Sequence, residues 1–226
     1  MDVSETLQYS TKPCIMLIGF CVLKRWEKMF QGDQEQELPP HHGEQMSVEA
    51  FEELAKQATA VRYEYINGRA YAMSGGTANH SRLTGKMYRL LEEQLASGPC
   101  HAFFDMYVLI AQERSVLPDV VVTCDVADYR NNATLIRSPH LIVEALSPAT
   151  ERIDRTEKFE AYKSLPSLQE YVLIHQKQYK VEAYRKVNGW QPQYYGPGEE
   201  IELMSLDLTV SLDELYTASY SHCIAI

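Results

Sequence analysis

The chain has 226 residues, and its 45% hydrophobic and 23% charged side chains are typical of a globular protein with an ordinary core. The formal net charge of −10 argues against a broad basic surface for nucleic acid, so any DNA contact would be local or assisted by bound cations. The apolar run 14–23 is too short to span a bilayer and lacks the charge order of a signal peptide, which predicts a cytoplasmic protein without a membrane span.

The cysteine pattern indicates neither a disulfide framework nor a zinc site. Five cysteines stand at positions 14, 21, 100, 124 and 223, so the number is odd. No C-x-x-C pair and no His/Cys zinc spacing occurs in the sequence. We therefore expect reduced thiols, as is usual in the cytoplasm.

The segment 1–46 differs in composition from the rest of the chain. Its part 31–43 is polar and contains two adjacent prolines, a pattern typical of a linker or a disordered segment. We expect an N-terminal extension over 1–46, without chemistry of its own, and one folded domain over 47–226.

Regular secondary-structure signals begin at Ser47, which is a favourable N-cap for a helix through residue 58. The segments 63–66 and 69–73 flank Asn67-Gly68, the strongest short hairpin signal, because a type I′ turn needs positive φ at both positions. The sequence therefore predicts a helix followed by an N-terminal β-hairpin.

Helices and strands are then mixed along the chain. A helix is predicted over 79–96, with an apolar stripe formed by Leu83, Met87, Leu90, Leu91 and Leu95. Further strands are predicted at 101–110, 117–124, 140–146, 171–175 and 180–186, with a helix over 154–164 and a tail of strand and short helix to 216. This order predicts an α/β or α+β fold with a central sheet.

Two carboxylates interrupt apolar runs that otherwise read as buried strands. They are Asp119 in the run 117–122 and Glu144 in the run 141–146. A buried charge is strongly unfavourable unless it is paired or binds a metal. If the two strands are neighbours, both carboxylates reach one cation, and their hard oxygen atoms suit Mg²⁺ or Mn²⁺.

A lysine on the following helix completes this group. Asp154, Lys158 and Tyr162 recur at i, i+4 and i+8 and so share one helix face. If that helix packs against the Glu144 strand, the Lys158 ammonium could orient an attacking water and offset charge in the transition state. A structural reading is also open for each residue, since Glu144 could pair with Arg137, Arg152 or Lys158, and Asp154 with Lys158 on the surface. Taken together, however, Asp119, Glu144 and Lys158 favour a functional site over three separate structural roles.

Two further residues are less specific signals. Glu64, on the predicted hairpin, is as well explained by a solvated face as by a metal ligand. His80, near the start of the long helix, could face the same site, but a capping or surface histidine is the default at such a position.

At these residues the chain resembles the PD-(D/E)XK nuclease superfamily, through Pro118-Asp119 and a following apolar strand that bears Glu144. More narrowly, it is similar to the Uma2 family (also called DUF820), whose members are classed as restriction endonucleases and are abundant in cyanobacteria. The resemblance covers residues 47–216 and rests on an ordered set of segments, namely 63–68, 117–122, 143–150, 154–162, 170–174 and 212–215.

The resemblance implies a restriction-endonuclease-like fold, in which a mixed central β-sheet is flanked by helices and preceded by a β-hairpin. It also implies an endonuclease that hydrolyses DNA phosphodiester bonds with a water activated by Mg²⁺ (or Mn²⁺). Asp119 and Glu144 would bind the metal with the carbonyl of Ala145, and Glu64 would complete the acidic cluster. The usual motif has lysine two residues after the glutamate, where this chain has Leu146, so Lys158 would be the catalytic counterpart.

Two other functions stay open. A catalytically inactive member would use the same fold as a binding or assembly module, which the negative net charge and the displaced lysine favour. A metal phosphoesterase with a small substrate is the other option. A homodimer would suit double-strand cutting by two-fold symmetry.

Overall fold

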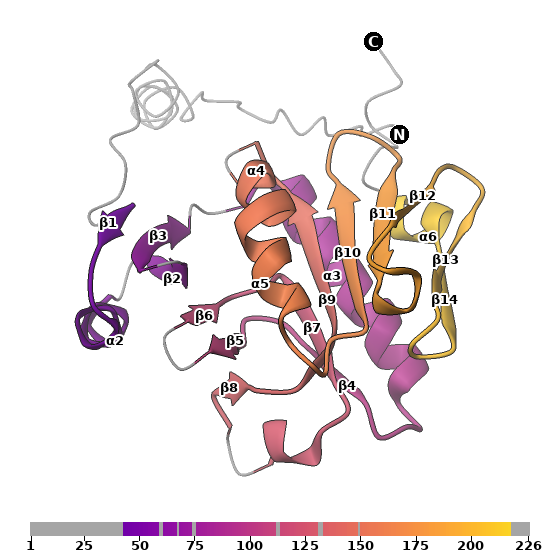
Figure 1. Ribbon diagram of the computed structural model, residues 1–226. Coiled ribbons are helices and arrows are strands. Elements are labelled where there is room, and N and C mark those ends of the chain that lie inside the picture. Colours follow the sequence, from indigo (N-terminus) through magenta and orange to yellow (C-terminus); the bar gives the residue numbers. More distant parts are fainter. Residues whose placement is uncertain are drawn as a thin grey trace, which may run out of the picture. The chain divides into compact units, whose positions relative to one another are not determined.

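The computed structural model describes residues 43–58, 61–66, 68–73, 76–111, 114–130, 133–148 and 150–217 (Figure 1). All of them belong to the compact unit Pro39–Ile226. The expected extension 1–46 lies outside the described residues except for its last positions. There, strand β1 (Glu44–Gln45) pairs with β3 (Arg69–Met73), so regular structure begins before residue 47.

The first elements are the helix and the hairpin that the sequence predicts. Helix α2 (Val48–Gln57) begins after Ser47, whose side chain accepts a hydrogen bond from the Ala50 amide at 3.2 Å. Strands β2 (Arg62–Ile66) and β3 pair antiparallel, and together with α2 they enclose a small apolar cluster. Residue 67 of the expected turn lies outside the described residues, whereas Gly68 has a φ of +77°.

The turn at Gly68 gives a test of this hairpin. A Cβ at Gly68 would be strained at positive φ and would lie 2.9 Å from Gln45 Nε2. We expect Gly68→Ala to lower the free energy of unfolding by about 1–2 kcal/mol. Gly85→Ala is the matched control, because a Cβ there meets nothing within 4 Å. This mid-helix change should raise stability by about 0.5–1 kcal/mol. Urea denaturation checks both, and a neutral Gly68→Ala would contradict the assigned turn.

The central sheet has six strands in the order β12-β11-β10-β9-β7-β4. Strands β9 and β10 are parallel, while the other neighbouring pairs are antiparallel. The bounds are β4 His101–Phe103, β7 Val120–Thr123, β9 Pro139–Leu146, β10 Glu170–His175, β11 Val181–Arg185 and β12 Pro192–Tyr195. The mixed sheet of the expected restriction-endonuclease-like fold is confirmed.

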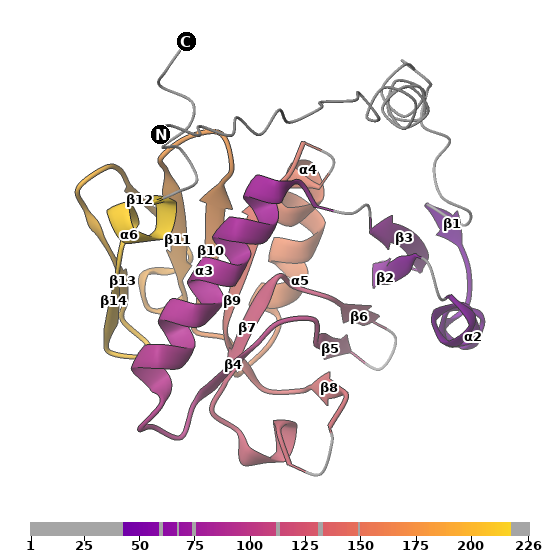
Figure 2. The ribbon, with the colours of Figure 1, turned by 180° about the vertical axis from the view of Figure 1, so that it is seen from behind.

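Helices cover both faces of this sheet (Figures 1 and 2). On one face lies α3 (Ala78–Leu95), whose expected apolar stripe is fully buried against the sheet. On the other face lies a continuous helical segment made of α4 (Glu151–Ile153), the π-helix η2 (Asp154–Lys158) and α5 (Phe159–Lys163). Alternate residues of β9 therefore contact different helices, because successive side chains of a strand point to opposite faces.

Two predicted elements differ from the structure. The strand expected at 101–110 is broken, because Asp105 has a φ of +61° and turns the chain between β4 and β5 (Tyr107–Ala111). Strand β5 joins a small separate sheet with β6 (Arg114–Val116) and β8 (Leu135–Ile136). The helix expected at 154–164 begins earlier and contains the π-helical turn, which no sequence signal indicated.

The C-terminal part is more regular than a simple tail. The 3₁₀ turns Val126–Asp128 and Lys186–Asn188 shape two connections. Strands β13 (Glu200–Leu203) and β14 (Leu208–Ser211) form a hairpin, and α6 (Leu212–Tyr216) packs beside α3.

In the part of the chain that the structure describes, no helix has both the length and the apolar character to cross a membrane.

The expectation of reduced thiols is wrong for two of the five cysteines. Cys100 and Cys124 form a disulfide, with their Cα atoms 3.9 Å apart. The cause is tertiary, since β4 pairs with β7 through His101 and Thr123 and so places the two neighbouring cysteines opposite each other. Cysteines 14, 21 and 223 lie outside the described residues.

Candidate functional site

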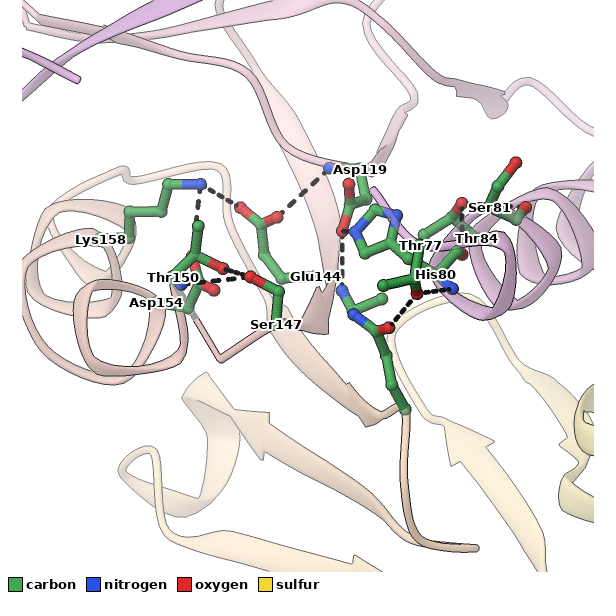
Figure 3. A network of polar contacts seen from close by, with 12 residues as sticks. Thr77, His80, Ser81, Thr84, Asp119, Glu144, Ser147, Thr150, Asp154 and Lys158 are labelled. Carbon is green, nitrogen blue, oxygen red and sulfur yellow. Dashed lines mark hydrogen bonds and ion pairs between the residues drawn. The ribbon is translucent and has the colours of Figure 1, made fainter. Parts of the chain in front are cut away.

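The strand register brings the two carboxylates together, as expected. Val120 of β7 pairs with Val143 of β9, which places Asp119 beside Glu144. The Asp119 amide donates a hydrogen bond to Glu144 Oε2 at 3.3 Å, and the Ala145 amide donates one to Asp119 Oδ2 at 2.8 Å. Each carboxylate is thus oriented by the backbone of the other strand, at the edge of the β7–β9 pair (Figure 3).

Lys158 lies inside the acidic cluster. Its Nζ is 2.9 Å from Glu64 Oε1 and 3.0 Å from Glu144 Oε1. Asp154 Oδ1 is a third ion-pair partner, at 3.4 Å. The ammonium has three N–H donors and three carboxylate neighbours, and its side chain is only 3% exposed. Lys158 therefore holds the cluster together in this structure.

Two neighbouring residues fix the positions of the glutamates. Tyr162 donates a hydrogen bond from its hydroxyl to Glu144 Oε1 at 3.0 Å, so the face shared with Lys158 is real. The Leu117 amide donates one to Glu64 Oε1 at 2.9 Å. Glu64 is buried, so the solvated-face reading that the sequence left open is wrong for this residue.

Burial dominates the electrostatics of the cluster. It raises the pKa of Glu144 well above its ordinary value, and the Lys158 ammonium offsets this only in part. Burial likewise raises the pKa values of Glu64 and Asp154, again against the effect of Lys158. Lys158 itself has a raised pKa, because the surrounding carboxylates outweigh its own burial. The cluster therefore holds more acidic groups than one ammonium neutralises.

The sequence left His80 open, with a capping or surface histidine as the default, and the structure places it beside Asp119. His80, on the first turn of α3, lies with its Nε2 3.0 Å from Asp119 Oδ2 (Figure 3). Its hydrogen bond with Asp119 raises the pKa of His80 above the ordinary value. A histidine in the first turn of a helix carries no local signal for this role, because the contact depends on how α3 packs against the sheet.

A cleft of about 830 Å³ opens beside the cluster. Asp119 and His80 line it, together with residues from β2, β3, the part of α3 from His80 to Tyr88 and the turn after β4. Glu144 and Lys158 are not among its lining residues, since they lie behind Asp119. A substrate in this cleft would therefore meet the acidic cluster through Asp119.

The oxygen-rich donor set fits a hard divalent cation, although no ready-made centre is present. No group of three His, Cys, Asp or Glu side chains within the described residues is arranged to hold a metal ion. However, Asp119 Oδ1 takes part in none of the hydrogen bonds among those residues, and the cluster has an excess of carboxylates. Glu64 as a metal ligand stays a prediction, because its contacts are with Lys158 and the Leu117 amide.

Comparison with known proteins identifies the family. Residues 48–213 match the Uma2 family model, described as "Putative restriction endonuclease". The chain belongs to the Uma2 family. Two uncharacterized Synechocystis sp. (strain ATCC 27184 / PCC 6803 / Kazusa) proteins are similar to it. The protein slr1290 is 35% identical over 69% of this chain and 83% of its own length. The protein sll1609 is 37% identical over 65% of this chain and 86% of its own length.

A solved structure agrees with the Uma2 fold. The crystal structure described as a putative nuclease belonging to DUF820 from Anabaena variabilis ATCC 29413 has a TM-score of 0.65 to this chain. It is 19% identical and covers 76% of this chain and 98% of its own. At this identity the likeness shows the fold alone. Membership in Uma2 classes the chain with nucleases.

Proposed function

We propose that this Uma2 protein is a divalent-metal-dependent endonuclease that hydrolyses DNA phosphodiester bonds. The observation that carries the proposal is the reciprocal pairing of Asp119 and Glu144 across β7 and β9, beside an open cleft. Asp119 and Glu144 would hold Mg²⁺ or Mn²⁺, with the Ala145 carbonyl as a further oxygen. A bound divalent cation polarises a phosphoryl oxygen and lowers the pKa of its water.

The protein side chains have separate roles in this proposal. Asp119 faces the cleft and is the carboxylate that substrate would reach first. Lys158 and Tyr162 both bind Glu144 Oε1, so they position this carboxylate and leave Oε2 directed toward Asp119. Preorganised groups of this kind need no rearrangement during the reaction. A homodimer would bring two such sites together, and DNA contact would stay local because the net charge is −10.

Removal of the Asp119 carboxylate tests this function. Wild type should nick plasmid DNA with Mg²⁺ or Mn²⁺ and lose this activity in EDTA. Asp119→Asn should lose both the nicking and the heat of Mn²⁺ binding in calorimetry. Asp105→Asn is the matched control, since Asp105 lines the same cleft but contacts Arg62 instead of the cluster. Equal Mn²⁺ binding by wild type and Asp119→Asn would refute the proposed metal site.

A metal-free binding module is the second candidate. The observation in its favour is that Lys158 already occupies the space between Glu64, Glu144 and Asp154. In that case wild type would bind nucleic acid without nicking it under any metal, and Mn²⁺ would produce no binding heat.

A further inference from the structure

An exposed phenylalanine and a partly buried tyrosine, Phe104 and Tyr88, form an aromatic pair that lines the same cleft as Asp119. Phe104 is 60% exposed, and its ring meets that of Tyr88 edge to face at a centroid distance of 4.9 Å. Both residues line the cleft that also contains Asp119. Ligand sites are lined mainly by apolar and aromatic side chains, which makes this pair a candidate binding element of the cleft.

Helix α3 connects this pair to the site. His80, Thr84 and Tyr88 follow one another at i, i+4 and i+8, so they lie on one face of α3, and all three line the cleft. Tyr88 is two turns beyond His80, which is about 12 Å along the helix axis. Along one stacked strand this distance corresponds to about three to four nucleotides. The aromatic pair and Asp119 could therefore contact one short oligonucleotide.

The charges of the cleft do not suit a duplex. Among the described residues that line it, the only Lys or Arg is Arg62, which is already paired with Asp105. Asp119 adds a further carboxylate. Proteins that hold double-stranded DNA contact its phosphates mainly through several Lys and Arg side chains. Proteins that hold single strands also use basic grooves, but they gain part of their affinity from aromatic side chains on which unpaired bases stack. The exposed ring of Phe104, rather than the charges, therefore favours a single strand here.

We propose that Phe104, supported by Tyr88, is a stacking platform for an unpaired base, so that the cleft binds single-stranded or locally opened DNA. The turn at Asp105 presents Phe104 on the cleft side of the sheet edge. Tyr88 packs partly against the main core and so gives the platform a fixed support. This inference rests on the proposed function for its substrate class, but it concerns binding and can be measured without cleavage.

The test is fluorescence anisotropy with a short labelled DNA, offered as a single strand and as the matching duplex. The protein is titrated into the labelled DNA once in the presence of Ca²⁺ and once in the presence of EDTA. Wild type should bind the single strand more tightly than the duplex. Phe104→Ala should weaken single-strand binding by about 5- to 150-fold, which is the effect of losing one stacked base. Phe104→Trp should retain binding, while Phe104→Leu should not restore it, because it keeps the bulk and removes the ring.

Tyr194→Ala is the matched control. Tyr194 is an aromatic residue of similar exposure, 56%, but it is not a lining residue of the cleft. This variant should bind the single strand as wild type does. A Phe104→Ala variant with unchanged single-strand binding would overturn the platform, and so would a wild type without saturable binding in either condition.

The outcomes separate this inference from the proposed function. If no metal supports nicking but single-strand binding depends on Phe104, the nuclease proposal fails and the platform stands. If nicking requires Asp119 and a metal while Phe104→Ala binds normally, the platform fails and the nuclease proposal stands.

Discussion

Replacing Lys158 by methionine is expected to lower the free energy of unfolding by about 3–5 kcal/mol at neutral pH, because it leaves buried carboxylates without a cation. The side chains of Lys158, Glu64, Glu144 and Asp154 are each no more than 6% exposed. Methionine is similar in length to lysine, so the expected loss of stability comes from the missing positive charge rather than from missing side-chain volume. Urea denaturation in the presence of EDTA measures this effect without interference from bound metal.

The loss of stability in Lys158→Met should grow as the pH rises. In the folded protein the pKa values of Glu64, Glu144 and Asp154 are raised by burial. An acid with a raised folded-state pKa contributes stability below its unfolded pKa, and this contribution is lost as pH rises through the folded pKa. Lys158→Met should raise these values further. The variant should therefore lie near wild type at about pH 5 and fall well below it at about pH 8.

A second lysine provides the control for this experiment. Lys86 has a side chain 28% exposed, and its Nζ is 3.9 Å from Glu214 Oε1. Lys86→Met should change stability by less than about 1 kcal/mol, as expected for a surface ion pair. If Lys158→Met were equally mild, or if its effect did not change with pH, the buried cluster would not be held by the lysine.

Replacing Glu144 by glutamine should cause a large loss of activity and little loss of stability. Under the proposed function the change removes one of the two carboxylates that hold the metal. The expected decrease in nicking rate is about 100-fold or more, since metal binding supplies several kcal/mol to the transition state. Supercoiled plasmid in Mg²⁺ is the substrate for this measurement.

The stability of Glu144→Gln follows from the pKa of the residue it replaces. Burial raises the pKa of Glu144, so its charged form is unfavourable in the folded protein at neutral pH. Glutamine keeps an oxygen that can accept from Lys158 and Tyr162. We expect the free energy of unfolding at neutral pH to stay within about 1 kcal/mol of wild type or to increase.

The control for Glu144→Gln is Glu160→Gln, an exposed position on α5 whose carboxylate pairs with Lys163 at 2.7 Å. This variant should nick DNA at the wild-type rate. A Glu144→Gln variant that is well folded and fully active would contradict the assignment of Glu144 as a metal ligand, whatever the behaviour of Asp119→Asn.

Local patterns in the sequence were sufficient for most of the regular elements. The stripe of α3 and the hairpin around Gly68 depend on neighbouring residues, so periodicity and turn chemistry predict them. Asp119 and Glu144 were recognisable because each places a charge within an apolar run, which is rare without a partner. Their convergence could be expected as soon as the two runs were taken as neighbouring strands.

Other features depend on contacts between distant segments. The Cys100–Cys124 disulfide requires the β4–β7 register, and the contact between His80 and Asp119 requires α3 to pack against the face of the sheet. The π-helical turn that carries Lys158 and the break at Asp105 that exposes Phe104 are likewise invisible to periodicity.

The sequence by itself determined that Glu144 would be buried, because the apolar run of a central strand fixes the environment of the residues within it. Only the tertiary structure decided what surrounds this carboxylate. It places one ammonium between three carboxylates and sets an aromatic pair along the cleft beside the fourth, since the distances between side chains on separate elements are set by strand order and helix packing.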